Sequence, residues 1–392
     1  MRICCIAYTF YESDTRVRMY AEALAQRGDH VEVMALKEDS QVRYRLLKGV
    51  HVYGIQTRRP NERGKADYLY RLIEFLIRSA FLLTKRSIRN PYNVVHIHSV
   101  PDFEVFAAFF AKMMGAKVIL DIHDILPEFY SSKFNVDPKS IAFRILLWLE
   151  KASTAFADHV IVANHLWKQK LIQRSTRENK CTAILNYPDA SIFFRRGNLR
   201  LNRRFLIVYP GTLNNHQGVD IAIRSFARIC DQVPHVEFHI YGAGGMKEYL
   251  VELTRKLGLQ NRIIFKGWCS AEKIGEIIAE ADLGVVPKRN GSFGGEAFST
   301  KILEFMAAGV PVIVSATKID RYYFNDAVVR FFEPESEADL AEKMLGLIND
   351  DEERARLAAK ADEFLENYKW ENRKYEYFRL VDGLAETAKN LQ

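Results

Sequence analysis

The chain has 392 residues, 48% of them hydrophobic, so it is long enough for two domains that each bury a core. Its 56 Lys and Arg exceed its 49 Asp and Glu, and the net charge of +7 suits anionic substrates or an anionic membrane surface. No nucleic-acid-binding module and no basic stripe interleaved with aromatic residues is present, so we expect no nucleic acid partner. The five cysteines show no metal-ligand spacing, which predicts reduced core thiols of a cytoplasmic protein.

The start of the chain is interrupted by a charged residue too early for a signal peptide. No uncharged apolar run approaches the roughly 18 residues that a membrane-spanning helix needs. We therefore expect a soluble or peripheral protein.

The first half of the chain alternates apolar segments with helical ones. The expected strands are 3–8, 31–36, 94–98, 117–122 and 160–163, and a helix is expected over 15–27, ended by Gly28. Strands that are apolar throughout predict a parallel sheet with both faces covered. In the loop after the first strand, Asp14 is most simply a helix cap, and a contact from Arg16 to a donor or acceptor substrate is the alternative.

Residues 71–86 have charged residues in a narrow stripe and apolar residues elsewhere at helical spacing, and 141–151 add further apolar residues. Core packing is the default interpretation of this helix. The alternative is peripheral docking on an anionic bilayer, because basic rims beside apolar faces occur at membrane interfaces.

Histidines end two of the strands. His123 follows the strand 117–122 beside Asp124 and is a candidate ligand-binding residue, or alternatively half of an Asp–His pair that structures the loop. His96 and His98 end the strand before it, and His98 is expected to face the ligand. No cysteine or carboxylate completes a metal set with these two histidines, so we expect no metal.

A second series of strands follows residues 187–204, a linker rich in turn formers, Arg and Asn. These strands are expected at 205–209, 236–241, 262–265, 283–286 and 312–314. Two successive series predict two doubly wound Rossmann-like domains, which bind ligands at the carboxyl ends of their strands, and the cleft between the domains is the expected site.

The loop after residue 209 begins Pro-Gly-Thr-Leu and ends in Gln-Gly at Gly218. Gly211 allows backbone amides to approach a diphosphate. The loop itself contains no Lys or Arg. Lys301, the dipole of the helix that carries it, and either Lys288 or Arg289 would then balance the phosphate charge.

Glu296 and Glu304 enclose seven residues, Ala-Phe-Ser-Thr-Lys-Ile-Leu. Ser299 or Thr300 can cap a helix that Gly309 ends, and Lys301 lies in its first turn. Free N–H groups at a helix start and a lysine suit a phosphate, while the two carboxylates can accept hydrogen bonds from sugar hydroxyls. A solvated helix face is the competing interpretation of these charges, but an apolar helix end followed by Gly-Val-Pro and a β-branched strand indicates burial.

The segment 295–314 resembles the signature of glycosyltransferase family 4, retaining sugar transferases of the GT-B fold. In that family a Glu-x7-Glu pattern precedes a phrase like Ala-x-Gly-x-Pro-Val-Ile, and the likeness extends along nearly the whole chain. The resemblance implies an acceptor-binding domain over 1–190, a nucleotide-sugar-binding domain over 191–369, and a last helix, 370–392, that crosses back to the first domain.

The resemblance also assigns roles. Glu296 would bind the sugar hydroxyls, and Glu304 would hold the ribose. Lys301 and the amides of Ser299 and Thr300 would stabilise the departing diphosphate.

On the same grounds, His123 would contact the sugar from the first domain, and the segment carrying Trp268 would border the nucleobase. Many members have Arg and Lys where this chain has Thr212 and Gln217. A branch with Gly-Thr-Leu and Gln-Gly in this loop shares that departure.

The implied reaction needs no metal and no cofactor, and its donor is a UDP- or GDP-linked sugar. The acceptor would be a hydroxyl of a glycan or a polyprenyl-linked lipid, in surface polysaccharide or glycoconjugate assembly at the inner face of the cell membrane. Two alternatives share the fold: a sugar-nucleotide 2-epimerase, and a non-catalytic protein that binds nucleotide sugars.

Overall fold

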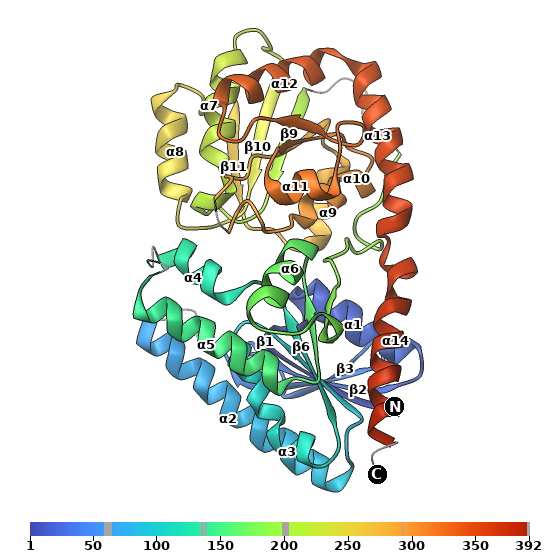
Figure 1. The fold of residues 1–392 in the computed structure, drawn as a ribbon. Helices are drawn as coiled ribbons and strands as arrows, with labels where there is room; N and C mark the ends of the chain where they lie inside the picture. Colours follow the sequence, from blue (N-terminus) through green and yellow to red (C-terminus); the bar gives the residue numbers. More distant parts are fainter. Residues whose placement is uncertain (59–64, 135–136, 138, 198–203, 292, 390–392) are drawn as a thin grey trace. The chain divides into compact units, whose positions relative to one another are not determined.

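The structure, a computed structural model, describes residues 1–58, 65–134, 137, 139–197, 204–291 and 293–389. The chain divides into two compact units (Figure 1). Unit 1 comprises Met1–Asn186 and Arg373–Gln392, and unit 2 comprises Tyr187–Asn372. The boundaries expected from sequence, 190/191 and 369/370, compare with 186/187 and 372/373 here.

Unit 1 is built on an eight-stranded sheet in the order β3-β4-β2-β1-β5-β6-β7-β8. Its strands are β1 (Arg2–Phe10), β2 (His30–Lys37), β3 (Tyr44–Leu47), β4 (Val50–Thr57), β5 (Val94–His98), β6 (Lys117–Ile122), β7 (His159–Val162) and β8 (Cys181–Ala183). Its helices are α1 (Thr15–Gln26), α2 (Lys65–Arg89), α3 (Phe109–Met113), α4 (Leu126–Phe134), α5 (Ile141–Phe156), α6 (His165–Arg174) and α14 (Trp370–Lys389), which begins just before the unit boundary. Every pairing is parallel except that of β3 with β4.

The prediction of a parallel sheet covered on both faces is confirmed, but the edge hairpin β3–β4 was not predicted. Leu47 pairs with Val50, so Lys48 and Gly49 form a two-residue turn in which both have positive φ, 48° and 83°. This backbone twist matches the twist of a hairpin. The sequence signal for this turn was weak because it has a lysine at the position where Asn or Asp is usual.

Unit 2 contains a six-stranded, wholly parallel sheet in the order β11-β10-β9-β12-β13-β14. Its strands are β9 (Phe205–Pro210), β10 (Val236–Tyr241), β11 (Ile263–Gly267), β12 (Leu283–Val286), β13 (Val312–Ser315) and β14 (Arg330–Phe332). Its helices are α7 (Val219–Ile229), α8 (Lys247–Lys256), α9 (Ala271–Ala279), α10 (Thr300–Ala307), α11 (Lys318–Tyr323), α12 (Glu337–Asn349) and α13 (Asp351–Leu365). Separate apolar clusters cover the two faces of this sheet, one around Phe226 and Phe238 and one around Phe305.

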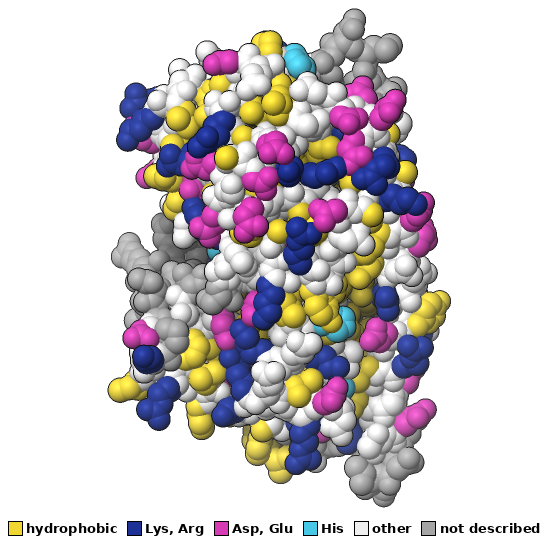
Figure 2. Space-filling model, turned by 45° about the horizontal axis from the view of Figure 1, so that its top comes forward, with side chains coloured by type: hydrophobic (Ala, Val, Ile, Leu, Met, Phe, Trp, Pro, Cys, Tyr) yellow, Lys and Arg dark blue, Asp and Glu magenta, His cyan; other side chains and the backbone are white. Residues whose placement is uncertain are grey.

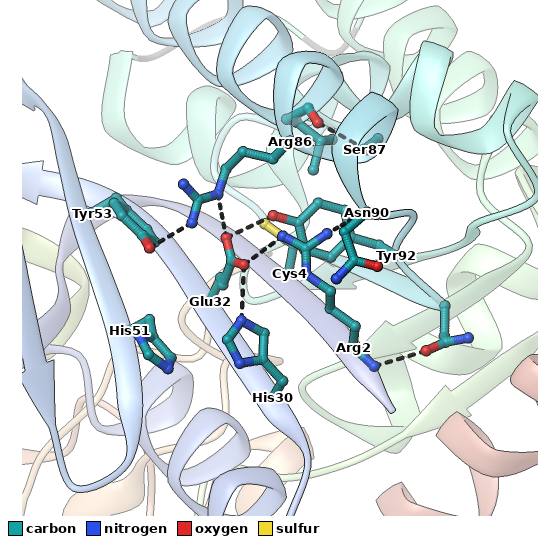
Figure 3. A network of polar contacts seen from close by, with 12 residues as sticks. Arg2, Cys4, His30, Glu32, His51, Tyr53, Arg86, Ser87, Asn90 and Tyr92 are labelled. Atoms are coloured by element: carbon teal, nitrogen blue, oxygen red, sulfur yellow. Dashed lines mark hydrogen bonds and ion pairs between the residues drawn. The ribbon is translucent and has the colours of Figure 1, made fainter.

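A polar network joins α2 to the strands of unit 1 (Figure 3). Glu32 on β2 is 1% exposed and accepts hydrogen bonds from Arg2, Arg86 and Tyr92, at 2.6, 2.5 and 2.7 Å. Burial acts to raise the pKa of Glu32, but these hydrogen bonds outweigh it and lower the pKa to about 2. Because its oxygens are fully engaged, this buried acid anchors the helix to the sheet.

The surface drawn in Figure 2 mixes basic and acidic side chains, so the net charge of +7 does not form one positive field on that face. Among the described residues, none of the helices combines the length and the apolar character that crossing a bilayer requires.

Candidate functional site

The start of α10 is open in the way that its sequence indicates. Ser299 is the N-cap residue, but its side chain accepts no capping hydrogen bond. Its hydroxyl is buried and has no hydrogen-bond partner among the described residues. The first N–H groups of a helix also have no partner within the helix, so this end presents several polar groups that a ligand could satisfy.

A cavity of about 400 Å³ in unit 2 adjoins this helix start. Ser299, Thr300, Lys301 and Glu304 line it from α10 and its approach. Gly211, Thr212, His216 and Gln217 line it from the loop after β9, and Phe193 and Ile274 add apolar surface. The structure thus brings six of the predicted site residues together around one hollow.

Gly211 lies so close to Lys301 that a side chain at this position would displace the lysine. Its φ is +150°, and a Cβ there would lie 2.3 Å from the lysine Cε. Gly242, in the loop after β10, is packed against the Gly211 carbonyl in turn. The glycines of these two loops therefore allow the backbone to run beneath the lysine, as the sequence predicts for a close-approach loop.

Lys301 and Glu304 occupy the cavity without forming an ion pair with each other. Lys301 donates a 3.3 Å hydrogen bond to Gln217, and Glu304 has no hydrogen-bond partner among the residues that the structure describes. Desolvation by the surrounding protein lowers the pKa of Lys301 to about 8 and raises that of Glu304 to about 7, although each charge opposes the shift of the other. The pair is therefore less charged at neutral pH than it would be in water.

The other cations expected to balance phosphate charge are already paired. Lys288 lines the cavity but is buried, 2.9 Å from Asp320 and hydrogen-bonded to the Ala297 carbonyl at 2.7 Å. Arg289 is held by Asp220 at 2.7 Å and does not line the cavity. An acid remote in sequence is thus the partner of each cation, and a role for either in phosphate binding stays a prediction.

Two predicted residues lie outside this cavity. Glu296 does not line it and forms a 3.1 Å ion pair with Lys318 on α11. Trp268 is 75% exposed and does not line it either. Conversely, His216 was not predicted; it is hydrogen-bonded to Gln217 at 3.0 Å, and burial lowers its pKa to about 4.

In unit 1, the carboxyl ends of β5 and β6 carry a compact polar cluster. His123 Nε2 lies 3.1 Å from His98 Nδ1, and each of these nitrogens lies 3.3 Å from Asp121 Oδ2. Arg16, near the start of α1, donates to both oxygens of Asp121 at 2.7 and 2.8 Å. Burial acts to raise the pKa of Asp121, but Arg16 and His123 outweigh it and hold the pKa well below its ordinary value. His123 is thus oriented by Asp121 rather than by its sequence neighbour Asp124.

The remaining predictions for this edge have mixed outcomes. Asp14 caps α1 by accepting from the Val17 N–H at 3.1 Å, as predicted. Arg16 is buried and its guanidinium contacts Asp121 and Asn186, and its contact with a substrate stays a prediction. His98 meets His123, whereas His96 is buried against the Tyr377 hydroxyl on α14.

The prediction that no cysteine or carboxylate completes a metal set with these histidines is wrong as regards the distances between the side chains. The ligand atoms of His98, Asp121 and His123 lie within 4.8 Å of one another, as do those of Cys5, His96 and His98. However, the guanidinium of Arg16 engages both oxygens of Asp121 and supplies the positive charge that a cation would bring. The trio is better described as a hydrogen-bonded cluster.

Each of the two units matches a known protein family. Residues 191–364 match the family model of glycosyl transferases group 1, and residues 13–186 match that of the glycosyl transferase 4-like domain. The gpi3 subunit of phosphatidylinositol N-acetylglucosaminyltransferase from Schizosaccharomyces pombe is 25% identical over 343 residues, which is 86% of this chain and 70% of the relative.

Two solved structures share the fold across the chain. Sucrose-phosphate synthase from Thermosynechococcus elongatus superposes with a TM-score of 0.79 at 18% identity, covering 98% of this chain and 99% of the other. HepE from Anabaena in complex with UDP-glucose gives a TM-score of 0.71 at 18% identity and covers both chains fully, at 100% each. The prediction of a GT-B fold is confirmed by these superpositions.

Proposed function

Because the chain is a glycosyltransferase of the GT-B type, we propose that it moves a sugar from a nucleoside diphosphate sugar to an acceptor hydroxyl. The donor is UDP- or GDP-linked, and the acceptor is a glycan or a lipid-linked molecule. The complex of HepE with UDP-glucose supports the donor class, and the phosphatidylinositol acceptor named for the yeast relative supports a lipid acceptor.

The observation that carries this proposal is the helix start beside Lys301. A buried, unpartnered hydroxyl, free N–H groups and one desolvated lysine converge on a cavity of about 400 Å³. A diphosphate satisfies all of them, and its charge grows as the bond to the sugar breaks. Since Lys288 and Arg289 are engaged elsewhere, Lys301 and the helix carry this task.

Glu304 lies one turn further along the same helix. Its carboxylate lacks a protein partner among the described residues, so two ribose hydroxyls can donate to it. Thr212 and Gln217, which replace the usual basic residues, offer neutral hydrogen bonds to the phosphates.

The reaction proceeds with retention. The acceptor oxygen attacks the anomeric carbon on the face that the diphosphate leaves, and the acceptor proton passes to the departing phosphate oxygen. Lys301 and the helix start supply the stabilisation that a metal would otherwise give, so the reaction needs neither a metal nor a cofactor.

Glu296 binds the hydroxyls of the transferred sugar in this proposal. It precedes α10 and is mostly buried beside Lys318, so the sugar would extend beyond the diphosphate cavity toward α11. His123 is also assigned to the sugar hydroxyls, because Asp121 and His98 fix its ring while leaving it partly exposed.

A first experiment measures binding. We expect UDP or GDP, with their sugars, to raise the melting temperature of the wild-type chain by mass action, and Lys301→Ala to abolish the shift. Lys247→Ala on α8 removes an exposed lysine of the same unit and is the matched control. A wild-type chain with no shift at millimolar nucleotide would contradict the proposal.

A second experiment separates transfer from its alternatives. Glu296→Ala is expected to lose sugar transfer while keeping the nucleotide-induced shift, because Lys301 and Glu304 remain. Interconversion of nucleotide sugars without an acceptor would indicate an epimerase, and binding without any turnover would indicate a non-catalytic protein. Parent-like transfer by Glu296→Ala would remove this residue from the site.

A further inference from the structure

The helix α2 is apolar on two sides. Leu72, Phe75 and Leu83 are buried against the rest of unit 1. Leu69, Tyr70, Ile73, Ile77, Phe81 and Ile88 are large hydrophobic residues with exposed fractions between 43% and 70%. Helices that are apolar all round are normally buried on all sides, so this second stripe lacks a partner in the chain that the structure describes.

The exposed apolar surface continues onto two neighbouring helices. In Figure 1, α2, α3 and α5 lie on one side of unit 1. Helix α2 contacts α3, and α2 and α5 both contact the segment Asp102–Ala108. The residues that extend it are Phe109, Phe110 and Met113 on α3, and Ile141, Ile145 and Trp148 on α5. We call this surface the apolar face; it is larger than the single exposed hydrophobic residues of an ordinary surface.

The charges around the apolar face are basic and mostly uncompensated. Lys85 and Arg89 on α2 and Arg144 and Lys151 on α5 are exposed and form no ion pair with any residue that the structure describes. The acids of these helices are neutralised: Asp67 pairs with Arg71, Glu74 with Arg78, and buried Glu150 with Arg174. Such a surface attracts anions and offers nothing to a basic partner.

Lys85 also fits into the apolar stripe itself. It lies four residues after Phe81 and three before Ile88, which places the three side chains on one helical face. A long lysine stem covers apolar surface while its ammonium reaches the headgroup level of a membrane.

A cavity of about 800 Å³ adjoins the stripe at the carboxyl ends of β2 and β4. Tyr70 and Phe81 line it together with four basic residues and two acids. Arg71 and Arg78 are paired with Asp67 and Glu74, so Lys37 and Arg43 are its remaining cations, against Asp39. Gln56 is buried beside it, and its Oε1 has no partner among the described residues. A polar, basic hollow next to an apolar stripe matches the succession of phosphate headgroups and acyl chains in a bilayer.

We propose that the apolar face docks unit 1 on an anionic lipid bilayer, with Ile77, Phe81 and Trp148 entering the acyl boundary and Lys85, Arg89, Arg144 and Lys151 contacting lipid phosphates. This surface does not depend on the transfer activity, and it would present unit 1 to acceptors held in the membrane.

Co-sedimentation of the full chain with vesicles tests the docking. We expect binding to vesicles of phosphatidylcholine with 30–40% phosphatidylglycerol (roughly the anionic content that gives a strong surface potential), weakened by salt, and little binding to phosphatidylcholine alone. The double variant Lys85→Glu with Arg89→Glu should bind at least about 30-fold more weakly, because each basic residue near an anionic surface contributes about fivefold. The control Lys247→Glu with Lys266→Glu makes the same charge change on unit 2 and should bind like the wild type.

The apolar half of the proposal is tested with Ile77→Ser and Phe81→Ser together, against Tyr249→Ser and Val251→Ser on α8 of unit 2. The first pair should lose vesicle binding, and the second pair should keep it. Equal binding by both pairs, or a wild-type chain that stays in the supernatant with both vesicles, would overturn the proposal. So would a wild-type dimer that the first pair converts to a monomer without any vesicle binding.

Trp148 provides a direct readout because it is 65% exposed on the face, whereas Trp268 is 75% exposed on unit 2. Brominated lipids in anionic vesicles should quench the fluorescence of the wild type and of Trp268→Phe, but not that of Trp148→Phe. If quenching were lost in Trp268→Phe and kept in Trp148→Phe, the membrane would contact unit 2, and the proposal would be refuted.

Discussion

Glu32 in unit 1 is buried and Glu304 in unit 2 is half-buried at the wall of a cavity, and their surroundings shift their pKa values in opposite directions. Glu32 receives hydrogen bonds from two arginines and a tyrosine, and its pKa falls to about 2 (Figure 3). Glu304 receives none from the described residues, and its pKa rises to about 7. The carboxylate of Glu32 has all its hydrogen bonds without a ligand, whereas that of Glu304 would gain them from a ligand.

The comparison distinguishes a structural acid from a binding acid on physical grounds. A buried carboxylate whose oxygens are all hydrogen-bonded stabilises the fold, because removing it leaves the charges of its partners uncompensated. A carboxylate held without partners costs stability and is retained where a ligand supplies the hydrogen bonds. The same reasoning applies to Lys288, which Asp320 neutralises, and to Lys301, which is left for a ligand.

The largest effect that the comparison predicts is on folding. Glu32→Ala leaves Arg2 and Arg86 without their acid, which costs about 3–5 kcal/mol for a buried pair. For a unit of this size, we expect the melting transition to fall by about 10 °C, measured by circular dichroism. Tyr92→Phe, which removes one hydrogen bond and no charge, should cost far less. An unchanged melting temperature in Glu32→Ala would mean that the network does not contribute to the stability of unit 1.

Lys301→Ala tests the other side of the comparison through catalysis. Loss of the one desolvated cation at the diphosphate should lower the transfer rate by about 10²–10³-fold with little change in melting temperature. The rate is measured by release of nucleoside diphosphate in the presence of acceptor, with Lys247→Ala as control. A rate within a few-fold of the wild type would show that the helix alone stabilises the leaving group.

Glu304→Gln should change stability in the opposite direction from Glu32→Gln. The isosteric amide removes an uncompensated charge, so we expect the ligand-free melting temperature at pH 8 to rise, by an amount corresponding to about 1 kcal/mol. The nucleotide-induced shift should shrink at the same time, because a charged acceptor for the ribose is lost. A fall in melting temperature would indicate that Glu304 has a structural partner.

The smallest effects appear in the pH dependence of these differences. The folded pKa of Glu32 lies below its ordinary 4.5, so the stability it contributes is present above that value and is lost as the pH falls from about 5 to about 2. The folded pKa of Glu304 lies above 4.5, so its cost is present above about pH 7 and disappears as the pH falls toward 4.5. Melting temperatures of Glu304→Gln and the wild type should therefore converge between pH 7 and 5, and those of Glu32→Gln and the wild type only below pH 5.

The sequence by itself determined the two parallel α/β units and the helix start that carries Ser299, Thr300, Lys301 and Glu304. Those features depend on hydrophobic runs and on residues that are neighbours along the chain, so local spacing is enough to place them. The loop glycine Gly211 was predicted for the same reason, although only the structure gives its approach to Lys301.

Only the tertiary structure decided which charged side chains are paired within the protein and which are available to a ligand. Arg16 meets Asp121 across 105 residues, and Asp320 takes Lys288 across 32. The β3–β4 hairpin, the place of His216 in the cavity and the exposure of the second stripe of α2 also followed only from packing. The physical reason is that burial and charge pairing are set by groups from distant segments, whose distances no local pattern specifies.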